Sequence, residues 1–448
     1  MTDKKRTLIF INLLLTCVAT SFLSTALSTA LPPIIKEFGI SASKGQWLTS
    51  AYSLAMAIMM PLTAYLITRY KTKNLYLTAI GILVAGLFIC IMAPSFEIML
   101  AGRILQAMSN GITTSMAQVV LLSIYPPEKK GTIMGWYGLS VGAAPVIAPT
   151  IAGIFVDTIG WRMIFVVTFV ILVISLIYAL IIFDNVLDTR IQKFDMISFV
   201  LSAFSFGGIT LGIGNLSNGI TKMLTWFPLL IGIFASIGFI RRQLGMRDPF
   251  LDLRVFQNKS FTISVLSSMF LYLIMMGSSI MMPLYVQSIM GRTATISGLV
   301  TLPGSLAMAL VSPYAGKLYD RLGMRKLAIS GAVGLFVAAL GMTFLTMESP
   351  LWIAALLQII RCVAIGCMMM PFVTWGVTSL GPSKTAHGNA LITALRTIAG
   401  AIGTASFVGI MTVASADSTP IHGMTVAYLV MTALSLLMIV MEIKMVRS

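Results

Sequence analysis

The chain has 448 residues, of which 58% are hydrophobic and only 10% are charged, and its mean hydropathy is +0.96. A soluble globular domain carries about 25% charged residues because it needs a wetted surface. This composition therefore excludes a soluble globular protein and predicts that most of the surface faces lipid. The net charge of +16 is typical of membrane-protein loops that face anionic lipid, so we expect no nucleic-acid partner.

Fourteen stretches are apolar enough to cross a bilayer, whose core of about 30 Å needs about 20 apolar residues per helix. The first follows Lys4, Lys5 and Arg6 and is too long for the apolar region of a signal peptide, so we interpret it as an uncleaved helix. The sequence thus predicts an all-α polytopic membrane protein with fourteen transmembrane helices. In chain order the stretches cover residues 7–31, 47–68, 75–93, 97–121, 131–155, 161–183, 196–214, 224–240, 260–285, 295–316, 327–346, 350–376, 388–411 and 424–443.

The charges of the connecting loops support this count. With the N-terminus in the cytoplasm, 22 of the 30 Lys and Arg residues lie in cytoplasmic segments and 5 lie outside. Cytoplasmic loops carry such an excess, and removing one span would invert every later loop. We therefore expect a multi-pass protein of the plasma membrane with both termini in the cytoplasm.

Two loops at matching places in the chain resemble each other. The loop after the tenth stretch reads Gly316-Lys-Leu-Tyr-Asp320-Arg321-Leu-Gly323-Met-Arg325-Lys326, and the loop after the second reads Ala64-Tyr-Leu-Ile-Thr68-Arg69-Tyr-Lys71-Thr-Lys73. Such a repeat indicates two related halves. The later loop resembles the loop signature of the major facilitator superfamily, whereas the earlier one has Thr68 in place of the family's Asp.

Two further motifs resemble drug exporters of that superfamily. Arg103-Ile-Leu-Gln106 is similar to a motif of their fourth helix, and the fifth stretch carries a glycine and proline pattern, namely Gly138, Gly142, Pro145, Pro149 and Gly153. With fourteen spans, the chain resembles the fourteen-helix drug/H⁺ antiporter subfamily, of the lincomycin-resistance type. The resemblance implies six-helix bundles at residues 1–185 and 259–448, with two linker helices and loops in residues 186–258.

The resemblance also implies which residues govern conformational change. They are the five glycines and prolines of the fifth stretch and the loop residues Gly316, Asp320, Arg321, Gly323 and Arg325. We expect Asp320 to take part in an Asp–Arg latch that holds the two bundles together at the cytoplasmic face.

Three arginines lie within predicted spans. A charged side chain in the bilayer is costly, so each should face the bundle interior or a wet cavity. Each is either an anchor bonded to amides such as Gln106 or Gln358, or a group that binds substrate. The predicted substrate cavity comprises these arginines and polar residues of central helices: Arg103, Gln106, Arg361, Arg396, Ser24, Tyr52, Tyr285 and Gln287.

Proton coupling requires a group that titrates, and arginine does not. No Asp or Glu lies deep within a predicted span, and Leu23 stands where relatives often carry an Asp in the first helix. We therefore expect the coupling carboxylate near a mouth of the protein. The candidates are Glu37, Asp157 beside Arg162, and Asp320.

The resemblance implies a secondary active multidrug efflux transporter that exports amphipathic drugs by alternating access in exchange for protons. The alternative is an exporter or flippase of an anionic or lipid-like metabolite, because three buried arginines without a buried acid make the cavity positive. We find no deep His/Asp/Glu cluster and no nucleotide-binding loop, so we do not expect an enzyme, a catalytic residue, a metal site or a cofactor. The expected partners are small-molecule drugs, protons and the lipid bilayer, and the expected state is a monomer.

Overall fold

The computed structural model of the protein describes residues 3–45, 47–190, 194–214, 223–292, 294–416 and 419–446. Each of the fourteen predicted stretches coincides with one long helix. The first six are α1 (Asp3–Phe38), α3 (Trp47–Arg69), α4 (Thr72–Met92), α5 (Phe96–Ile124), α6 (Lys130–Thr158) and α7 (Arg162–Ile182). The next two are α8 (Met196–Gly214) and α9 (Met223–Gly245). The last six are α10 (Lys259–Leu284), α11 (Ala294–Leu322), α12 (Met324–Thr343), α13 (Leu351–Thr378), α14 (Thr385–Ala416) and α15 (Pro420–Met445).

Short helical elements connect some of these helices. They are α2 (Ala42–Gly45), three 3-10 turns at Pro127–Lys129, Leu253–Gln257 and Pro382–Lys384, and a π-helical turn, η4 (Tyr285–Ile289). The π-helical turn directly follows Pro283 in the last turn of α10. A proline lacks the backbone N–H that continues an α-helical ladder, which accounts for the change of helix type at this point.

Twelve helices in the described parts of the chain are long and apolar enough to cross a membrane, so the protein is a multi-pass membrane protein. The two other long helices are α5 and α6. The polar residues Arg103, Gln106 and Asn110 lower the mean hydropathy of α5, and all three are buried inside the bundle. Burial removes polar side chains from lipid, so a helix of low hydropathy can lie at the centre of such a bundle.

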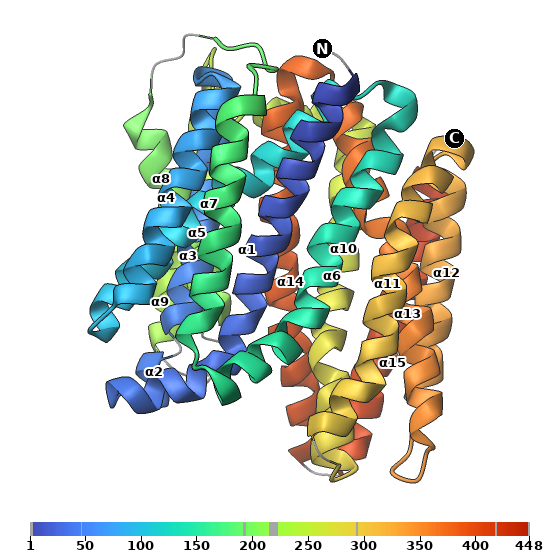
Figure 1. Ribbon diagram of the computed structural model, residues 1–448. Helices are drawn as coiled ribbons and strands as arrows, with labels where there is room; N and C mark the ends of the chain where they lie inside the picture. Colours follow the sequence, from blue (N-terminus) through green and yellow to red (C-terminus); the bar gives the residue numbers. More distant parts are fainter. Residues whose placement is uncertain are drawn as a thin grey trace.

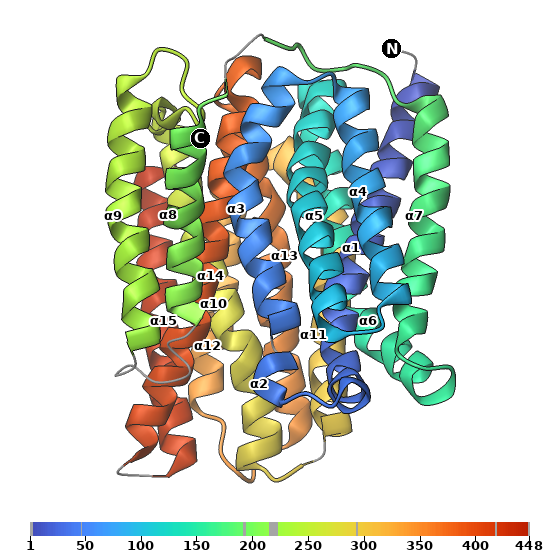
Figure 2. The same cartoon turned by 90° about the vertical axis from the view of Figure 1, so that its left-hand side faces the viewer.

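The helices form two groups with a hairpin beside them. In the first group α1 packs on α6 and α7, and α5 packs on α3 and α4. In the second, α10 packs on α14, and α13 packs on α11 and α12, while α12 also packs on α15. Both termini lie toward the same end of the molecule (Figure 1), which we call the termini end. The hairpin of α8 and α9 lies on one flank, next to α3 (Figure 2).

Glycines allow α8 and α9 to approach closely. A Cβ atom on Gly208 would lie 2.6 Å from the carbonyl oxygen of Pro228, and a Cβ atom on Gly232 would lie 2.6 Å from the amide nitrogen of Ile209. Small residues at helix interfaces permit such backbone contact in membranes. The hairpin is therefore held by backbone packing along much of its length.

An ion pair ties the two helices of the hairpin together at the termini end. Arg242 donates from Nε to Oδ2 of Asp195 at 2.9 Å and from Nη2 to Oδ1 at 3.0 Å. The Ser198 hydroxyl also donates to Asp195. The hydrogen bonds from Arg242, followed by that from Ser198, lower the pKa of Asp195 to about 2 despite its partial burial.

We expect Asp195→Asn to lower the thermal unfolding midpoint of the purified protein in detergent at pH 7. A carboxylate whose pKa is lowered in the folded state stabilises that state above its ordinary value of about 4. This stabilisation is lost as the pH falls toward 2, so wild type and variant should converge there. Asp188→Asn, in an exposed loop, is the control and should change nothing. Equal midpoints for Asp195→Asn and wild type at pH 7 would contradict this role.

Candidate functional site

A carboxylate joins the two groups of helices at the termini end. Asp320, in the last turn of α11, accepts hydrogen bonds from the backbone nitrogens of Gly131 at 2.9 Å and Thr132 at 2.7 Å, and from the Thr132 hydroxyl at 2.7 Å. Gly131 and Thr132 belong to the first turn of α6. The N-terminus of a helix carries free N–H groups and a partial positive charge, so it favours an anion. We call this contact the α6–α11 latch.

The expectation that an arginine is the partner of Asp320 is therefore wrong. Among the described residues, the ion pairs of the protein do not include Asp320. Arg321 and Arg325 of the same loop are exposed, and Gly323 takes a positive φ of 74° between α11 and α12. The helix N-terminus supplies the positive partner that the sequence interpretation assigned to an arginine.

Glycines let the two helices of the latch touch through their backbones. A Cβ atom on Gly131 or on Gly316 would collide with the backbone of the other glycine, and a Cβ atom on Gly135 would lie 2.5 Å from the Ser312 carbonyl oxygen. Gly138 packs similarly, with Met370 Cγ 2.7 Å from the position of a Cβ atom. Gly316 thus acts in close packing as well as in the loop motif.

The close approach ends before the far end of α6. A Cβ atom on Gly153 of α6, or on Gly298 near the start of α11, would have no neighbour within 4 Å. Three residues of the predicted glycine and proline motif, Gly142, Pro145 and Pro149, have side-chain positions outside the described residues. The two groups of helices are therefore pressed together at the termini end, and Gly153 does not extend that contact.

Arg103 is bonded within the first group of helices. It is 1% exposed, donates to Gln106 Oε1 at 2.7 Å, and stacks on the Tyr52 ring at 4.2 Å from the centroid. Gln106 in turn donates to the Gly86 carbonyl of α4 at 3.0 Å, and Asn110 donates to the Tyr52 hydroxyl at 2.7 Å. The structure thus brings together three of the predicted cavity residues in one internal network of α3, α4 and α5.

Arg361 is bonded in the same manner within the second group. It is 3% exposed, donates to Gln358 Oε1 at 3.1 Å, and contacts the Ser278 hydroxyl of α10. In both groups a buried arginine is thus paired with a glutamine one helical turn away. These contacts favour anchoring of the helices within each group over direct contact with a substrate.

Arg396 differs because it lies on α14, which packs against α3, α5 and α8 as well as α10. Its guanidinium lies over the Tyr272 ring at 4.9 Å from the centroid, and Nη1 is buried without a hydrogen-bond partner. Asn389, two turns earlier, donates to the Ser115 carbonyl of α5 at 3.2 Å. Arg396 therefore belongs to the interface between the two groups.

Several polar side chains of this interface are buried with unused hydrogen-bonding capacity. We call the set the polar seam; its unpartnered atoms are Ser115 Oγ, Gln118 Nε2 and Oε1, Asn389 Oδ1, Thr393 Oγ1 and Arg396 Nη1. A buried polar group without a partner is unfavourable, and most buried polar groups in proteins are bonded to protein or to ordered water. The seam is thus the part of the interface best suited to the polar groups of a ligand.

Sequence reasoning identified Arg396 but missed most of the seam. The signal was present on α14, because Asn389, Thr393 and Arg396 follow the i, i+4, i+7 spacing that places them on one face of a helix. Ser115 and Gln118 of α5 share a face in the same way. A search for polar faces, rather than for single charges, would have found both helices.

The other predicted cavity residues are dispersed. The side chain of Ser24 on α1 is exposed. It lies on a different face of this helix from the exposed Val18, because a separation of six residues is not a whole number of helical turns. Tyr285, the first residue of η4, is buried and donates to the Thr346 carbonyl between α12 and α13 at 2.7 Å. Gln287, two residues later, is exposed. The structure does not join these three residues to the seam.

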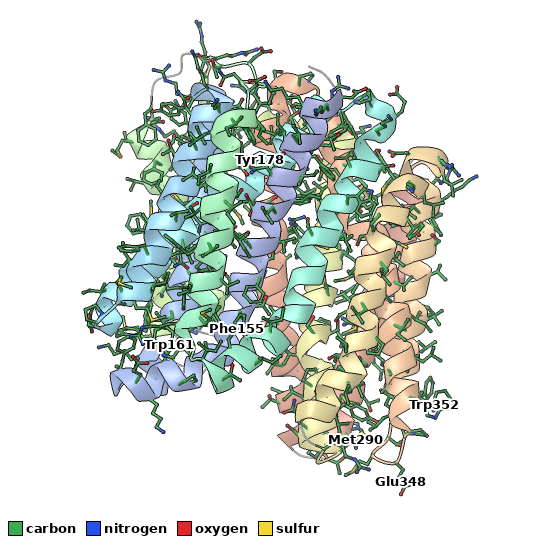
Figure 3. All side chains as sticks on the ribbon, viewed as in Figure 1. Phe155, Trp161, Tyr178, Met290, Glu348 and Trp352 are labelled. Atoms are coloured by element: carbon green, nitrogen blue, oxygen red, sulfur yellow. The ribbon has the colours of Figure 1, made fainter. Side chains whose placement is uncertain are left out.

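The predicted coupling carboxylate Glu37 forms an ion pair at the end opposite the termini. Arg162 donates to Glu37 Oε1 at 2.5 Å, and the Trp161 indole donates to Oε2 at 2.6 Å. Figure 3 shows Trp161 at this end of the molecule. Although partial burial raises the pKa of Glu37, the hydrogen bonds from Arg162 and Trp161 lower it overall. Arg162 therefore pairs with Glu37, and the side chain of Asp157 lies outside the described residues.

A buried acid lies near the end of the last predicted stretch, 424–443. Glu442, in the last turn of α15, has no exposed surface, and in the described part of the chain neither of its carboxylate oxygens has a hydrogen-bond partner. A buried carboxyl group is thus present in the second group of helices.

The described residues contain no group of three or more His, Cys, Asp or Glu side chains able to hold a metal ion. The four cysteines are free thiols.

Comparison with known proteins identifies a family and its relatives. Residues 13–404 match the Major Facilitator Superfamily. The chain is 36% identical over 420 residues to the uncharacterized MFS-type transporter YcnB of Bacillus subtilis, covering 92% of this chain and 89% of that protein. It is 34% identical over 412 residues to the lincomycin resistance protein LmrB of Bacillus subtilis, covering 91% of this chain and 86% of that protein. The fold is similar to the human organic anion transporter MFSD10, with a TM-score of 0.71 at 13% identity over 99% of this chain and 100% of that one.

We expect Asp320→Asn to loosen the α6–α11 latch. The variant keeps an amide oxygen as an acceptor but loses the negative charge at the α6 N-terminus, which contributes up to about 2 kcal/mol in a partly buried geometry. A cysteine introduced at Ser312, in the contact with Gly135, should then react about tenfold faster with a soluble thiol reagent, since about 1.4 kcal/mol corresponds to a factor of ten. Arg321→Gln is the matched control and should leave the labelling rate unchanged. If Arg321→Gln accelerates labelling and Asp320→Asn does not, the assignment of the latch to the α6 N-terminus is wrong.

Proposed function

The chain belongs to the major facilitator superfamily, whose members are transporters and not enzymes, and we propose that it exports amphipathic drugs in exchange for protons. The observation that carries this proposal is the buried polar seam between the two groups of helices, closed at one end by the latch. Relatives named for lincomycin resistance support the substrate class. The resemblance to fourteen-helix drug/H⁺ antiporters supports exchange with protons.

We further propose that α5 and α6 cross the membrane with the twelve apolar helices, which gives fourteen crossings. Both helices pack among helices of membrane-spanning length, α5 against α3 and α4, and α6 against α1 and α11. Fourteen crossings place both termini on one side, in agreement with their common end in Figure 1. The excess of Lys and Arg in the loops of that end supports a cytoplasmic location in the plasma membrane.

The proposed mechanism is alternating access between two bundles, residues 1–185 and 259–448, with the linker helices of residues 186–258 on their flank. Each bundle has its own buried Arg–Gln pair, which supports movement of the bundle as a unit. Since the latch holds the bundles together at the termini end, we assign that end to the closed cytoplasmic side. Release of Asp320 from α6 would open the seam toward the cytoplasm, where substrate enters.

Arg396 favours a second candidate, export of an anionic or lipid-like metabolite. Its unpartnered Nη1 gives the seam a positive charge, and no described carboxylate forms an ion pair with it. A positive group favours substrates that carry a carboxylate or phosphate. Norfloxacin carries a carboxylate beside a protonated amine, whereas ethidium carries only a positive charge, so these two drugs test whether the seam requires a carboxylate.

The test of the main proposal uses inverted membrane vesicles with an acid lumen and a pH dye inside. Addition of lincomycin, norfloxacin or ethidium should alkalinise the lumen if the drug enters in exchange for protons. Vesicles without the protein are the control. Drug uptake without a proton signal would exclude antiport, and uptake of norfloxacin alone would move the anionic class to first place.

Arg396→Ala and Arg361→Ala should differ in the same vesicles. Arg396 has an unpartnered nitrogen in the seam that can bind the drug carboxylate. Its removal should raise the norfloxacin concentration needed for half-maximal transport by about tenfold, which corresponds to the loss of one charged hydrogen bond. Arg361 anchors α10 and α13, so its removal should lower the unfolding midpoint without changing that concentration. The reverse result would assign substrate contact to Arg361 instead.

A further inference from the structure

Glu442 combines three features that place a titratable group inside the protein. It lies in the last turn of α15, it has no exposed surface, and both of its carboxylate oxygens lack hydrogen-bond partners among the described residues. Ser267 of α10 lies beside this carboxyl group, and its hydroxyl has no hydrogen-bond partner of its own among the described residues. The site therefore faces the packing between α15 and α10.

The other carboxylates for which contacts are described are already engaged. Glu37 pairs with Arg162, Asp195 with Arg242, Glu97 with Lys44 and Asp184 with Lys5. Asp320 binds the N-terminus of α6. A paired carboxylate is stabilised as the anion, so these groups are poor carriers of a proton in this conformation.

The neighbours of α15 provide no cation for Glu442. The helix packs on α12, α14, α10 and η4, whose titratable or charged groups are Lys259, Tyr272, Arg325, Lys326, His387, Arg396 and Tyr285. Arg325 and Lys326 are exposed, Arg396 lies over Tyr272, Tyr285 donates to the Thr346 carbonyl, and His387 accepts from the Asp252 backbone nitrogen. Neither Lys259 nor any other group in this set forms an ion pair with Glu442 among the described residues.

An ionised carboxylate in such surroundings would be an uncompensated buried charge, which is far more costly than the neutral acid. In this conformation the carboxyl group therefore holds a proton. Glu442 is three residues from the end of α15 at Met445, about 5 Å along the helix axis at 1.5 Å per residue. A small separation of α10 from α15 would thus bring water from the termini end to the carboxyl group and allow ionisation.

We propose that Glu442 is a proton-binding site of this transporter, which carries the proton exchanged for substrate. The carboxylate takes up one proton when the site is exposed to one compartment. The carboxylic acid returns that proton to water at the termini end when α10 moves away, and the Ser267 hydroxyl is placed to accept and donate hydrogen bonds during the transfer. This assignment rests on the proposed exchange of drug for protons.

The test compares wild type, Glu442→Gln and Glu348→Gln in inverted vesicles with norfloxacin as the probe. Glu348 is an exposed carboxylate at the tip of the α12–α13 loop (Figure 3) and serves as the matched control. Two quantities are measured: alkalinisation of the lumen, and exchange of labelled for unlabelled norfloxacin, which requires no net proton movement. We expect Glu442→Gln to lose about 100-fold in proton flux, the lower range for removal of a positioned proton-transfer group, while drug exchange persists. Glu348→Gln should match wild type in both.

The outcomes separate this inference from the proposed function. If wild type and Glu442→Gln give the same proton flux with norfloxacin, the inference is overturned, and the proposal of drug/proton exchange stands. If wild type exchanges norfloxacin but gives no proton signal, the exchange proposal fails and this inference fails with it. If Glu442→Gln does not reach the membrane, Glu442→Asp replaces it, because a carboxyl group withdrawn by one methylene should shift the pH profile of transport. An unchanged profile in Glu442→Asp overturns the inference.

Discussion

A charged or polar side chain inside a bilayer must find its partners within the protein, because lipid offers none. Arg103 meets this constraint through Gln106 and the face of Tyr52, and Arg361 meets it through Gln358 and Ser278. Each network joins helices of one group only. The same contacts that satisfy the charge therefore make each group an internally bonded unit, and the arrangement of the whole molecule depends on how two such units meet.

They meet in two different ways. At the termini end the contact consists of glycine backbones and one carboxylate on a helix N-terminus, Asp320 on α6. Along α5 and α14 the contact is polar and incompletely bonded, with Arg396 and Asn389 among the unpartnered groups. A small, tight contact next to unpartnered polar groups suits two units that separate and rejoin around a ligand. An apolar interface of equal size would instead favour permanent association of the two units.

The positions of most helices could be predicted because they are long apolar runs, and the predicted stretch 196–214 coincides with α8. The arginines within the predicted spans could be identified because a charged residue is conspicuous in an otherwise apolar stretch. The partner of Asp320 could not be predicted, since backbone N–H groups occur at every helix start and no residue type marks them. Arg162 pairs with Glu37, which precedes it by 125 residues, and only the packing of α1 beside α7 brings them together. Glu442 was missed because the end of a helix is buried or exposed according to its rotation, which depends on neighbouring helices.

The α6–α11 contact has a further consequence for the thermodynamics of closure. Gly131 and Gly316 have no side-chain rotamers, and Asp320 has a short side chain. Closing this end therefore sacrifices little side-chain conformational entropy, in contrast to a closure made by lysines, glutamates or methionines, which lose up to about 2 kcal/mol each on being fixed. The equilibrium between closed and open forms should accordingly depend only weakly on temperature through this term, and should be set mainly by the electrostatics of one anion at one helix end.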